Sequence, residues 1–161
     1  MVWGCFWGKN KGPLVPIPQR TITKIKDTRL LRRHLIPVIY QILASGIQDF
    51  LFQQDNAPVH KAYSVMDWLE ANNIDVFEHP PYSLDLNPIE HAWVELKKRL
   101  HQQYPRIGNT PGGKQAVKNK LAQVLPLVWE TIPEEFFEKL WKSIPRRVAA
   151  VLEAKGGYTR Y

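Results

Sequence analysis

Two acidic residues, Asp55 and Glu90, occupy positions from which their carboxylates could bind a metal ion. Asp55 follows the apolar run of residues 50–54, and Glu90 lies at the start of an expected helix, so each carboxylate would be carried by the end of a rigid element. Mg²⁺ prefers oxygen ligands of this kind. Paired Mg²⁺ or Mn²⁺ ions, roughly 3.5–4 Å apart, can activate a water or a 3′-hydroxyl and stabilise the leaving oxygen in phosphodiester chemistry.

Each acid also has a structural explanation. Glu90 lies three residues after Asn87, which is the spacing of a capping box, where the glutamate would only satisfy the helix start. Asp55 could be a turn residue before Pro58. The nearby histidines lack the spacing of a metal-ligand set and are interpreted as packing or surface residues: His60, His79 and His91. Spacing alone leaves these alternatives open.

The first part of the chain supplies a hairpin and an arginine-rich helix. Residues 2–7 and 14–17 are apolar runs on either side of a turn that contains glycine and proline, which predicts a hairpin. Residues 28–44 have apolar side chains at helical spacing, and Pro37 is expected to kink or divide this helix. Three cations lie on its other face: Arg29, Arg32 and Arg33.

The segment around Asp55 reads as strand, helix and strand. Residues 50–54 are a compact apolar strand, residues 59–71 have helical spacing, and residues 74–77 resume as a strand. A βαβ unit of this length predicts two parallel, adjacent strands. Asp55 would then lie at the carboxyl end of a strand, where α/β sheets present ligand sites.

The helix that carries Glu90 is strongly marked, with Asn87 as N-cap, Pro88 at the first position and Glu90 at the third. Three cations lie near its C-terminal end, where the helix dipole favours them: Lys97, Lys98 and Arg99. Residues 114–153 are expected to be helical, with Pro126, Pro133 and Pro145 as breaks or starts. Apolar residues of this stretch predict a covering layer for the core: Trp129, Ile132, Phe136, Leu140, Trp141, Ile144, Val148, Val151 and Leu152.

The predicted fold is therefore α/β, with a mixed sheet flanked by helices and a C-terminal helical cover. We expect a core over residues 1–105 and a helical extension over residues 106–161, packed on the same domain. A chain of 161 residues with 44% apolar and 23% charged residues is ordinary for one globular domain.

Charge is distributed unevenly along the chain, whose net charge is +7. Residues 1–54 have eight Lys and Arg against two acids, residues 55–90 have one against seven, and residues 91–161 have thirteen against six. An acidic centre between basic arms suits a cation site whose surroundings attract a polyanion. The alternative, that the basic residues only solvate helix faces, is equally compatible with charge alone.

Other features exclude some classes. No apolar run approaches the roughly 20 residues that a membrane-spanning helix needs. The first residues lack a basic segment followed by an apolar one, so we expect no secretory signal. The lone Cys5 excludes an internal disulfide, fits a reducing compartment and is interpreted as a small buried residue.

Two segments carry a resemblance to a known family. QQDNAPVH at 53–60 and HPPYSLDLNPIEHAW at 79–93 resemble the catalytic core of mariner-superfamily transposases, the Tc-one-like branch of the DDE enzymes. The 34 residues between the two acids are the interval typical of that branch. VWGCFW at the start and SIPRRVAAVLEAKGGYTRY at the end are similar to the family's flanking segments.

The resemblance implies a ribonuclease-H-like fold and metal-dependent hydrolysis of a DNA phosphodiester, followed by transesterification by the freed 3′-hydroxyl. Asp55 matches the second catalytic aspartate and Glu90 the terminal glutamate. Asn56, His60 and Asn87 match motif positions that support the site. The implied cofactor is Mg²⁺ or Mn²⁺ in a two-metal site, the implied partner is DNA, and the implied compartment is the nucleus. No small-molecule cofactor or membrane is implied, and a homodimer is an expectation for the complete transposase only.

The family needs three carboxylates, and the resemblance puts the first on a strand before residues 2–7, so we expect this chain to lack it. Asp49 is six residues from Asp55 on one run, about 20 Å away at ~3.3 Å per residue, and Asp27 is better explained as a helix N-cap. Neither is a credible replacement. We therefore expect an incomplete transposase core with weak or no catalysis alone.

Two other classes of protein are alternatives. A non-catalytic, transposon-derived nucleic-acid-binding or interaction module would keep the basic surfaces, here Arg29, Arg32, Arg33 and residues 97–99, and use the two acids only structurally. Its DNA binding would depend on salt and be indifferent to the acids. A cellular ribonuclease H or other nuclease would share the fold but explains the NPIE segment poorly.

Overall fold

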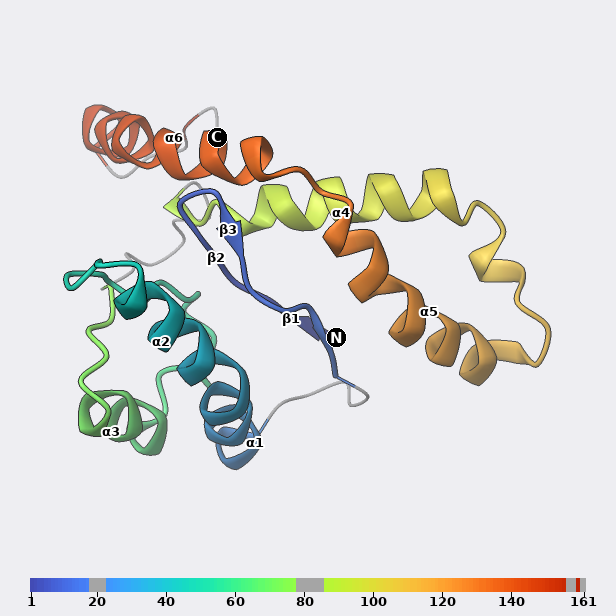
Figure 1. Cartoon of the computed structure of the whole chain (residues 1–161), viewed down its shortest axis with the longest axis horizontal. Helices are drawn as coiled ribbons and strands as arrows, with labels where there is room; N and C mark the ends of the chain where they lie inside the picture. Colours follow the sequence, from blue (N-terminus) through green and yellow to red (C-terminus); the bar gives the residue numbers. More distant parts are fainter. Residues whose placement is uncertain (18–22, 78–85, 156–158, 160–161) are drawn as a thin grey trace. The chain divides into compact units, whose positions relative to one another are not determined.

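The computed structural model describes residues 1–17, 23–77, 86–155 and 159 (Figure 1). Contacts along the backbone divide the chain into two compact units. Unit 1 comprises Met1–Arg20 and Pro88–Ala150, and unit 2 comprises Thr21–Asn87 and Val151–Tyr161. Glu90 therefore belongs to unit 1 and Asp55 to unit 2. The expected division at residue 105 stays a prediction.

Unit 1 opens with the predicted hairpin, which is confirmed. Strand β1 (Val2–Trp3) pairs antiparallel with β4 (Val15–Pro16), and β2 (Phe6–Trp7) pairs antiparallel with β3 (Asn10–Lys11). The turn between β2 and β3 begins at Gly8, whose φ of +53° is a backbone conformation that glycine adopts without steric cost. Strand pairing therefore extends to Asn10 and Lys11, which the apolar pattern had placed in the turn.

The helices of unit 1 differ from prediction at two prolines. Pro126 and Pro145 lie inside helices rather than breaking them, whereas Pro133 stands between two helices. A proline inside a helix removes one backbone hydrogen bond and introduces a steric clash with the preceding turn. Packing of the helix face against a core can offset this loss of stability. The elements are α4 (Ile89–Gln103), the short 3₁₀ helix η3 (Ile107–Asn109), α5 (Gly113–Glu130) and α6 (Glu134–Glu153).

Trp129 lies at the centre of the core of unit 1. It is fully buried, its ring centroid lies 5.6 Å from that of Trp93 and 5.1 Å from that of Phe137, and its indole N–H donates to the Gly12 carbonyl at 2.9 Å. One core therefore joins the hairpin to the helices. Its buried members are Leu14, Ala92, Leu96, Leu100, Val124, Val128, Trp129, Ile132, Phe137 and Leu140.

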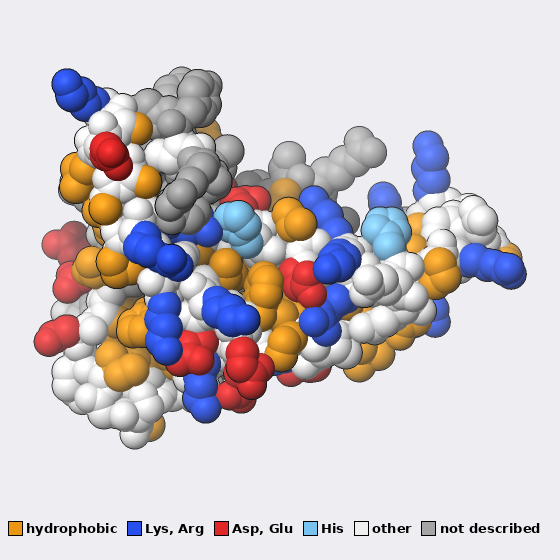
Figure 2. All heavy atoms as spheres, turned by 90° about the horizontal axis from the view of Figure 1, so that it is seen from above, with side chains coloured by type: hydrophobic (Ala, Val, Ile, Leu, Met, Phe, Trp, Pro, Cys, Tyr) orange, Lys and Arg blue, Asp and Glu red, His pale blue; other side chains and the backbone are white. Residues whose placement is uncertain are grey.

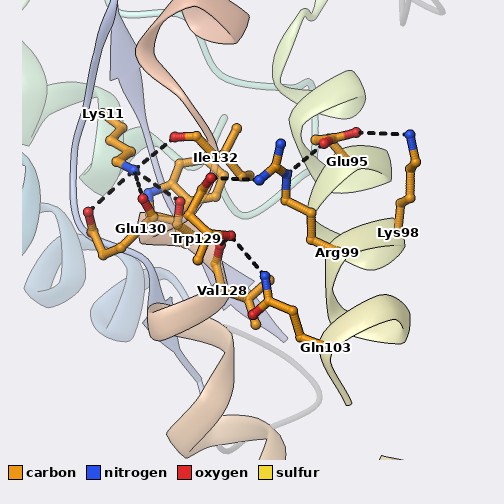
Figure 3. A network of polar contacts seen from close by, with 10 residues as sticks. Lys11, Glu95, Lys98, Arg99, Gln103, Val128, Trp129, Glu130 and Ile132 are labelled. Atoms are coloured by element: carbon orange, nitrogen blue, oxygen red, sulfur yellow. Dashed lines mark hydrogen bonds and ion pairs between the residues drawn. The ribbon is translucent and has the colours of Figure 1, made fainter. Parts of the chain in front are cut away.

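A polar network surrounds the C-terminal end of α5 (Figure 3). The Lys11 ammonium donates to the carbonyls of Trp129, Glu130 and Ile132 at 3.1, 2.6 and 3.0 Å. Arg99 of α4 bonds the Glu95 carboxylate and the Thr131 carbonyl, both at 2.6 Å. These cations satisfy carbonyls that a helix end leaves without intrahelical partners.

The helical cover is only partly as predicted. Trp129, Ile132 and Leu140 are buried as expected, but the expected core residues Trp141, Val148 and Leu152 are exposed on α6. The buried face of α6 instead includes polar side chains, Ser143 and Arg147, which share a hydrogen bond of 2.8 Å. The apolar residues of α6 are spread over more than one face of the helix, and only one of these faces is buried.

Unit 2 begins with a helix in three parts, α1 (Lys24–Leu30), the π-helical segment η1 (Leu31–Leu35) and α2 (Ile36–Ala44). The predicted kink or division of the helix at Pro37 is confirmed as a division, because the wider π-helical turn ends at Leu35, two residues before the proline. Helix α3 (Tyr63–Ala71) is shorter than predicted and packs beside α1. The buried side chains of unit 2 include Leu31, Leu35, Ile39, Val65, Leu69 and Ile74.

The predicted βαβ unit is confirmed as a single parallel bridge between Phe52 and Val76 on either side of α3. The Phe52 N–H donates to the Asp75 carbonyl at 2.8 Å, and the Phe77 N–H donates to the Phe52 carbonyl at 2.9 Å. Within the described ranges, strand pairing consists of this bridge and the two ladders of the hairpin. The fold is thus α/β and rich in helix. No helix in the described part of the chain is long and apolar enough to span a bilayer.

Candidate metal ligands and their surroundings

Asp55 ends the segment that pairs through Phe52 and begins a tight turn. Its side chain is 52% exposed, and its Oδ1 accepts the Ala57 N–H at 3.0 Å. The Ala57 carbonyl in turn accepts the N–H groups of His60 at 2.9 Å and Lys61 at 3.3 Å. The turn explanation for Asp55 is therefore confirmed for Oδ1 only. Oδ2 makes no hydrogen bond within the described residues, so one carboxylate can serve the turn through Oδ1 and a metal ion through Oδ2.

His60 lies between two carboxylates of unit 2. Its Nδ1 is 2.9 Å from Oδ2 of Asp27, and its Nε2 is 3.6 Å from Oδ1 of Asp55. Burial alone would lower the pKa of His60, but the hydrogen bond and charge of Asp27, together with the charge of Asp55, outweigh burial and raise that pKa. The interpretation of His60 as an ordinary packing residue therefore understates its contacts. His79 lies outside the described residues.

Asp27 corrects the sequence interpretation of this region. The N-cap of α1 is Thr23, whose hydroxyl accepts the Lys26 N–H at 3.4 Å, and not Asp27. Asp27 lies one turn farther along the helix, fully buried against His60. Sequence reasoning missed this contact, and no local signal could have found it, because 33 residues separate the two side chains.

Glu90 lies in the first turn of α4, exposed, in unit 1. The helix begins one residue later than predicted, and its N-cap is Pro88, with no side-chain cap hydrogen bond. The predicted cap at Asn87 is therefore wrong. A capping box needs the glutamate to accept the backbone N–H of the N-cap residue, and proline has none. The capping-box explanation of Glu90 thus fails.

The motif residues beside these acids are partly or fully buried. Asn56 is half-buried next to Asp55, and Asn87 is buried, with 6% exposure, before α4. The Gln53 side-chain amide donates to the Leu86 carbonyl, which ties the run before Asp55 to the end of the loop. Beside Glu90, burial and the Arg147 charge lower the pKa of His91, and the Glu90 charge opposes them.

The donor chemistry of these residues suits a hard divalent cation. Asp55 and Glu90 each expose a carboxylate to solvent at the end of a fixed element, one in each unit. In the described ranges, no group of three or more His, Cys, Asp or Glu side chains is arranged to hold a metal ion. Each unit by itself therefore supplies one of the two predicted ligands.

The predicted basic residues are in different situations. Arg29, Arg32, Arg33, Lys97 and Lys98 are exposed, whereas Arg99 is half-buried and engaged by Glu95 and Thr131 as described above. Figure 2 shows Lys and Arg side chains interspersed with acidic and apolar ones on the face drawn. Two further lysines missed from the sequence line a surface hollow at the start of α5 with Gly108, Thr110, Gly113 and Val117: Lys114 and Lys118.

Comparison with known proteins gives the family. The sequence model of the family described as DDE superfamily endonuclease matches residues 19–109. The chain is 35% identical over 161 residues to the transposable element Tc1 transposase of Caenorhabditis elegans, and 37% identical to the Tcb1 transposase of Caenorhabditis briggsae. Each match covers 100% of this chain and 54% of the relative. The chain thus spans about half the length of the curated relatives it matches.

Solved structures give the fold. The Mos1 transposase catalytic domain solved with raltegravir and Mg is similar with a TM-score of 0.73 and 19% identity, over 99% of this chain and 83% of that one. The Mos1 mariner paired-end complex with Mn is similar with a TM-score of 0.67 and 24% identity, over 87% of this chain and 38% of that one. The expected ribonuclease-H-like fold is confirmed. This chain belongs to the DDE superfamily of endonucleases, and within it the chain is similar to Tc1-type transposases.

Proposed function

We propose that this chain is a catalytic core of DNA transposition, in which Asp55 and Glu90 hold divalent metal ions for cleavage and transfer of DNA strands. The observation that carries the proposal is the state of Glu90. It stands in the motif that matches the family, it is exposed, and the helix start that would otherwise need it has a proline as N-cap. A carboxylate with no local structural task, at a motif position, is best explained by a ligand.

Mg²⁺ or Mn²⁺ fits the proposed donors, because both acids offer oxygen and the relatives solved with Mg and Mn share the fold. When bound, such ions would supply an activated attacking oxygen and charge stabilisation at the leaving oxygen. Asp55 would use Oδ2, since Oδ1 is engaged by the turn. The turn at Ala57 would restrict the motion of the Asp55 carboxylate, and the first turn of α4 would fix the backbone that carries Glu90.

DNA is the proposed partner, and the nucleus is the proposed compartment. The exposed arginines of α1 and η1, Arg29, Arg32 and Arg33, and the exposed Lys97 and Lys98 of α4 are proposed phosphate contacts. Arg99 is a weaker candidate because its guanidinium is already bonded within unit 1. Because this chain covers about half of its relatives' length, recognition of transposon ends and assembly of the complex are questions for the longer relatives.

The experiment is a Mn²⁺ titration of the whole chain, followed by paramagnetic broadening of backbone amide signals. We expect broadening to begin at Asp55–Ala57 and at the start of α4, and Asp55→Asn and Glu90→Gln each to weaken it at least about tenfold, since each removes a charged oxygen ligand. Asp49→Asn is the matched control, because Asp49 is exposed and lies on the same run before the turn.

The outcomes separate two functions. Loss of broadening in both variants, with Asp49→Asn unchanged, supports a role of both acids in metal binding. Broadening that is indifferent to both acids, together with salt-dependent DNA binding that they do not affect, would instead establish a DNA-binding module without catalysis.

A further inference from the structure

One end of unit 1 carries positive charge that its own acids do not balance. Residues 96–129, which run from the second half of α4 through η3 into α5, contain seven Lys and Arg and no Asp or Glu. The whole chain has 15 acids for 22 cations, so an even mixture would place acids among these seven. Arg99 is engaged by Glu95 and Thr131. The other six cations are exposed and make up the basic end of unit 1: Lys97, Lys98, Arg106, Lys114, Lys118 and Lys120.

The cations of the basic end have little compensation nearby. In the described part of the chain, one ion pair involves them, a contact of 4.0 Å between Lys98 and Glu95. Lys114 lies in the first turn of α5, where the helix dipole disfavours a cation, and that turn has no acidic residue to offset it. Lys118 follows four residues later, on the same side of the helix. Like charges gathered in this way repel one another, and a bound polyanion would relieve that repulsion.

The surface hollow at the start of α5 gives such a ligand room to approach. It is lined by Gly108, Thr110, Gly113, Lys114, Val117 and Lys118. A methyl group added at Gly108 or Gly113 would meet nothing within 4 Å, so the backbone there is open to a ligand. The right-hand end of the view in Figure 2 shows Lys and Arg side chains and no acidic ones.

The surroundings of these cations favour a nucleic-acid duplex over other partners. Between residues 97 and 120, no large apolar side chain is exposed, whereas a protein partner or a membrane surface would need apolar anchors beside the charges. Single-stranded nucleic acid would need exposed aromatic rings for base stacking, and Tyr104, the aromatic residue of this stretch, is half-buried. Lysines without apolar neighbours fit a sugar–phosphate backbone, which carries one phosphate per strand about every 3.4 Å.

We propose that the basic end of unit 1 binds the backbone of duplex DNA, at a distance from the phosphate that is cleaved. The choice of DNA rests on the proposed function. Glu90 lies in the first turn of α4 and Gln103 is its last residue, and about 13 residues at roughly 1.5 Å each separate them by about 20 Å. At about 3.4 Å per base pair, a duplex that follows α4 from a metal ion at Glu90 reaches the other end of the helix after about six base pairs. There η3 and the start of α5 follow, and their contacts neutralise phosphates without reading sequence.

The test measures binding of fluorescein-labelled duplexes of about 18 base pairs and unrelated sequence to the whole chain in EDTA, over a range of salt concentrations. We expect Lys114→Gln and Lys118→Gln each to weaken binding roughly tenfold at about 0.1 M salt. Each should also lower the slope of log affinity against log salt by about 1, equally for every sequence.

The matched control is Lys139→Gln/Lys142→Gln, which removes the same charge as Lys114→Gln/Lys118→Gln. Both control lysines are exposed on α6, and Lys142 is paired with Glu138 at 2.6 Å. The control should keep the wild-type slope and affinity.

Amide signals of the chain test the placement along α4. A hairpin duplex of about six base pairs should shift the signals at the start of α5, and only a duplex of about 18 base pairs should also shift those of the first turn of α4, because only the longer one reaches both. The proposal fails if neither duplex shifts the signals at the start of α5, or if the short duplex shifts the first turn of α4 instead.

The remaining outcomes separate this inference from its alternatives. Equal losses in the two double variants would mean that binding follows net charge alone, and no loss in either would mean that DNA binds elsewhere, so both results overturn the proposal. Competition by polyglutamate as strong as that by duplex DNA would assign the basic end to acidic proteins instead. The proposed metal site is tested separately, since Asp55→Asn and Glu90→Gln should not weaken DNA binding in EDTA, whatever they do to Mn²⁺ binding.

Discussion

At the scale of single residues, the two motif acids are treated differently by their surroundings. Asp55 accepts a backbone hydrogen bond through Oδ1 in its turn while its side chain is 52% exposed, whereas Glu90 is exposed two residues after a proline that has no N–H to donate to a capping carboxylate. The two acids therefore differ: Asp55 has one oxygen in a local hydrogen bond, whereas Glu90 has no part in capping its helix. A metal site tolerates both, because it needs one free oxygen from each acid.

Cys5 allows a prediction about reactivity. Burial raises the pKa of its thiol to about 12, and a hydrogen bond with the Gly12 backbone only partly opposes this. The thiolate is the reactive form, so native Cys5 should resist iodoacetamide at pH 8 and begin to react only as pH rises toward 12. The rate should rise at least about 100-fold when the chain is unfolded in urea at pH 8, since a free thiol has a pKa of about 8.5. Rapid labelling of the native chain at pH 8 would contradict the burial.

At the scale of elements, Gly4 sets how closely the hairpin approaches α4. A methyl group at Gly4 would lie 3.0 Å from Cη2 of Trp93 and 3.1 Å from Cδ1 of Leu14. The Trp93 ring packs on Trp129 and has little room to move. Gly4→Ala should therefore destabilise unit 1 by about 1–3 kcal/mol, as overpacked cores do.

Urea unfolding measures the effect of Gly4→Ala. The matched control is Gly108→Ala in η3, because a methyl group there has nothing within 4 Å and the backbone needs no positive φ. The control should leave the midpoint near that of the wild type. Equal midpoints for both variants would mean that the hairpin can move away from α4 at no cost.

Lys11 holds the C-terminal end of α5, and its removal should be costly. The ammonium donates to three carbonyls, and the Lys11 side chain is only 15% exposed. Lys11→Met keeps the aliphatic stem but leaves those carbonyls without their donor, so we expect a loss of about 1–3 kcal/mol in the free energy of unfolding. Lys9→Met is the control, because Lys9 makes only an exposed ion pair with Glu134 at 3.1 Å. The idea fails if both variants unfold at the same urea concentration.

The elements also mark what local sequence can predict. The hairpin, the helix around Pro37 and the parallel pairing of Phe52 with Val76 follow from apolar spacing and turn residues, and all three are confirmed. The exposed Trp141 and the buried Arg147 were not predicted, because spacing shows that a helix has faces but not which face meets the core.

The candidate site divides in the same manner. The motif identified Asp55 and Glu90, and local pattern even gave Glu90 a false structural explanation that the helix start at Pro88 removes. Asp27 was invisible, since a contact across 33 residues leaves no trace in spacing. The residues that carry chemistry were thus found by motif, while the contact between Asp27 and His60 needed the fold.

At the scale of the whole molecule, the proposed ligands are divided between two compact units, and the described residues contain no ready group of three metal-binding side chains. A two-metal reaction needs ligands enough to hold both ions around one phosphate. Metal binding needs only the oxygens of the two acids, whereas strand cleavage also needs a DNA phosphate placed on the bound ions, so we expect the purified chain to bind Mn²⁺ more readily than it cuts DNA, with weak or no nicking in Mg²⁺.

A supercoiled plasmid incubated with the chain and Mg²⁺ measures nicking directly. The controls are Asp55→Asn, which should match the wild-type chain at background, and EDTA, which removes any metal-dependent contaminant. Metal-dependent nicking by the wild-type chain that Asp55→Asn abolishes would show that two motif acids suffice, with a further ligand from water or from DNA itself. Nicking that Asp55→Asn leaves unchanged would instead come from another protein in the preparation. Background nicking by both chains, alongside Asp55-dependent Mn²⁺ binding, is the expected result.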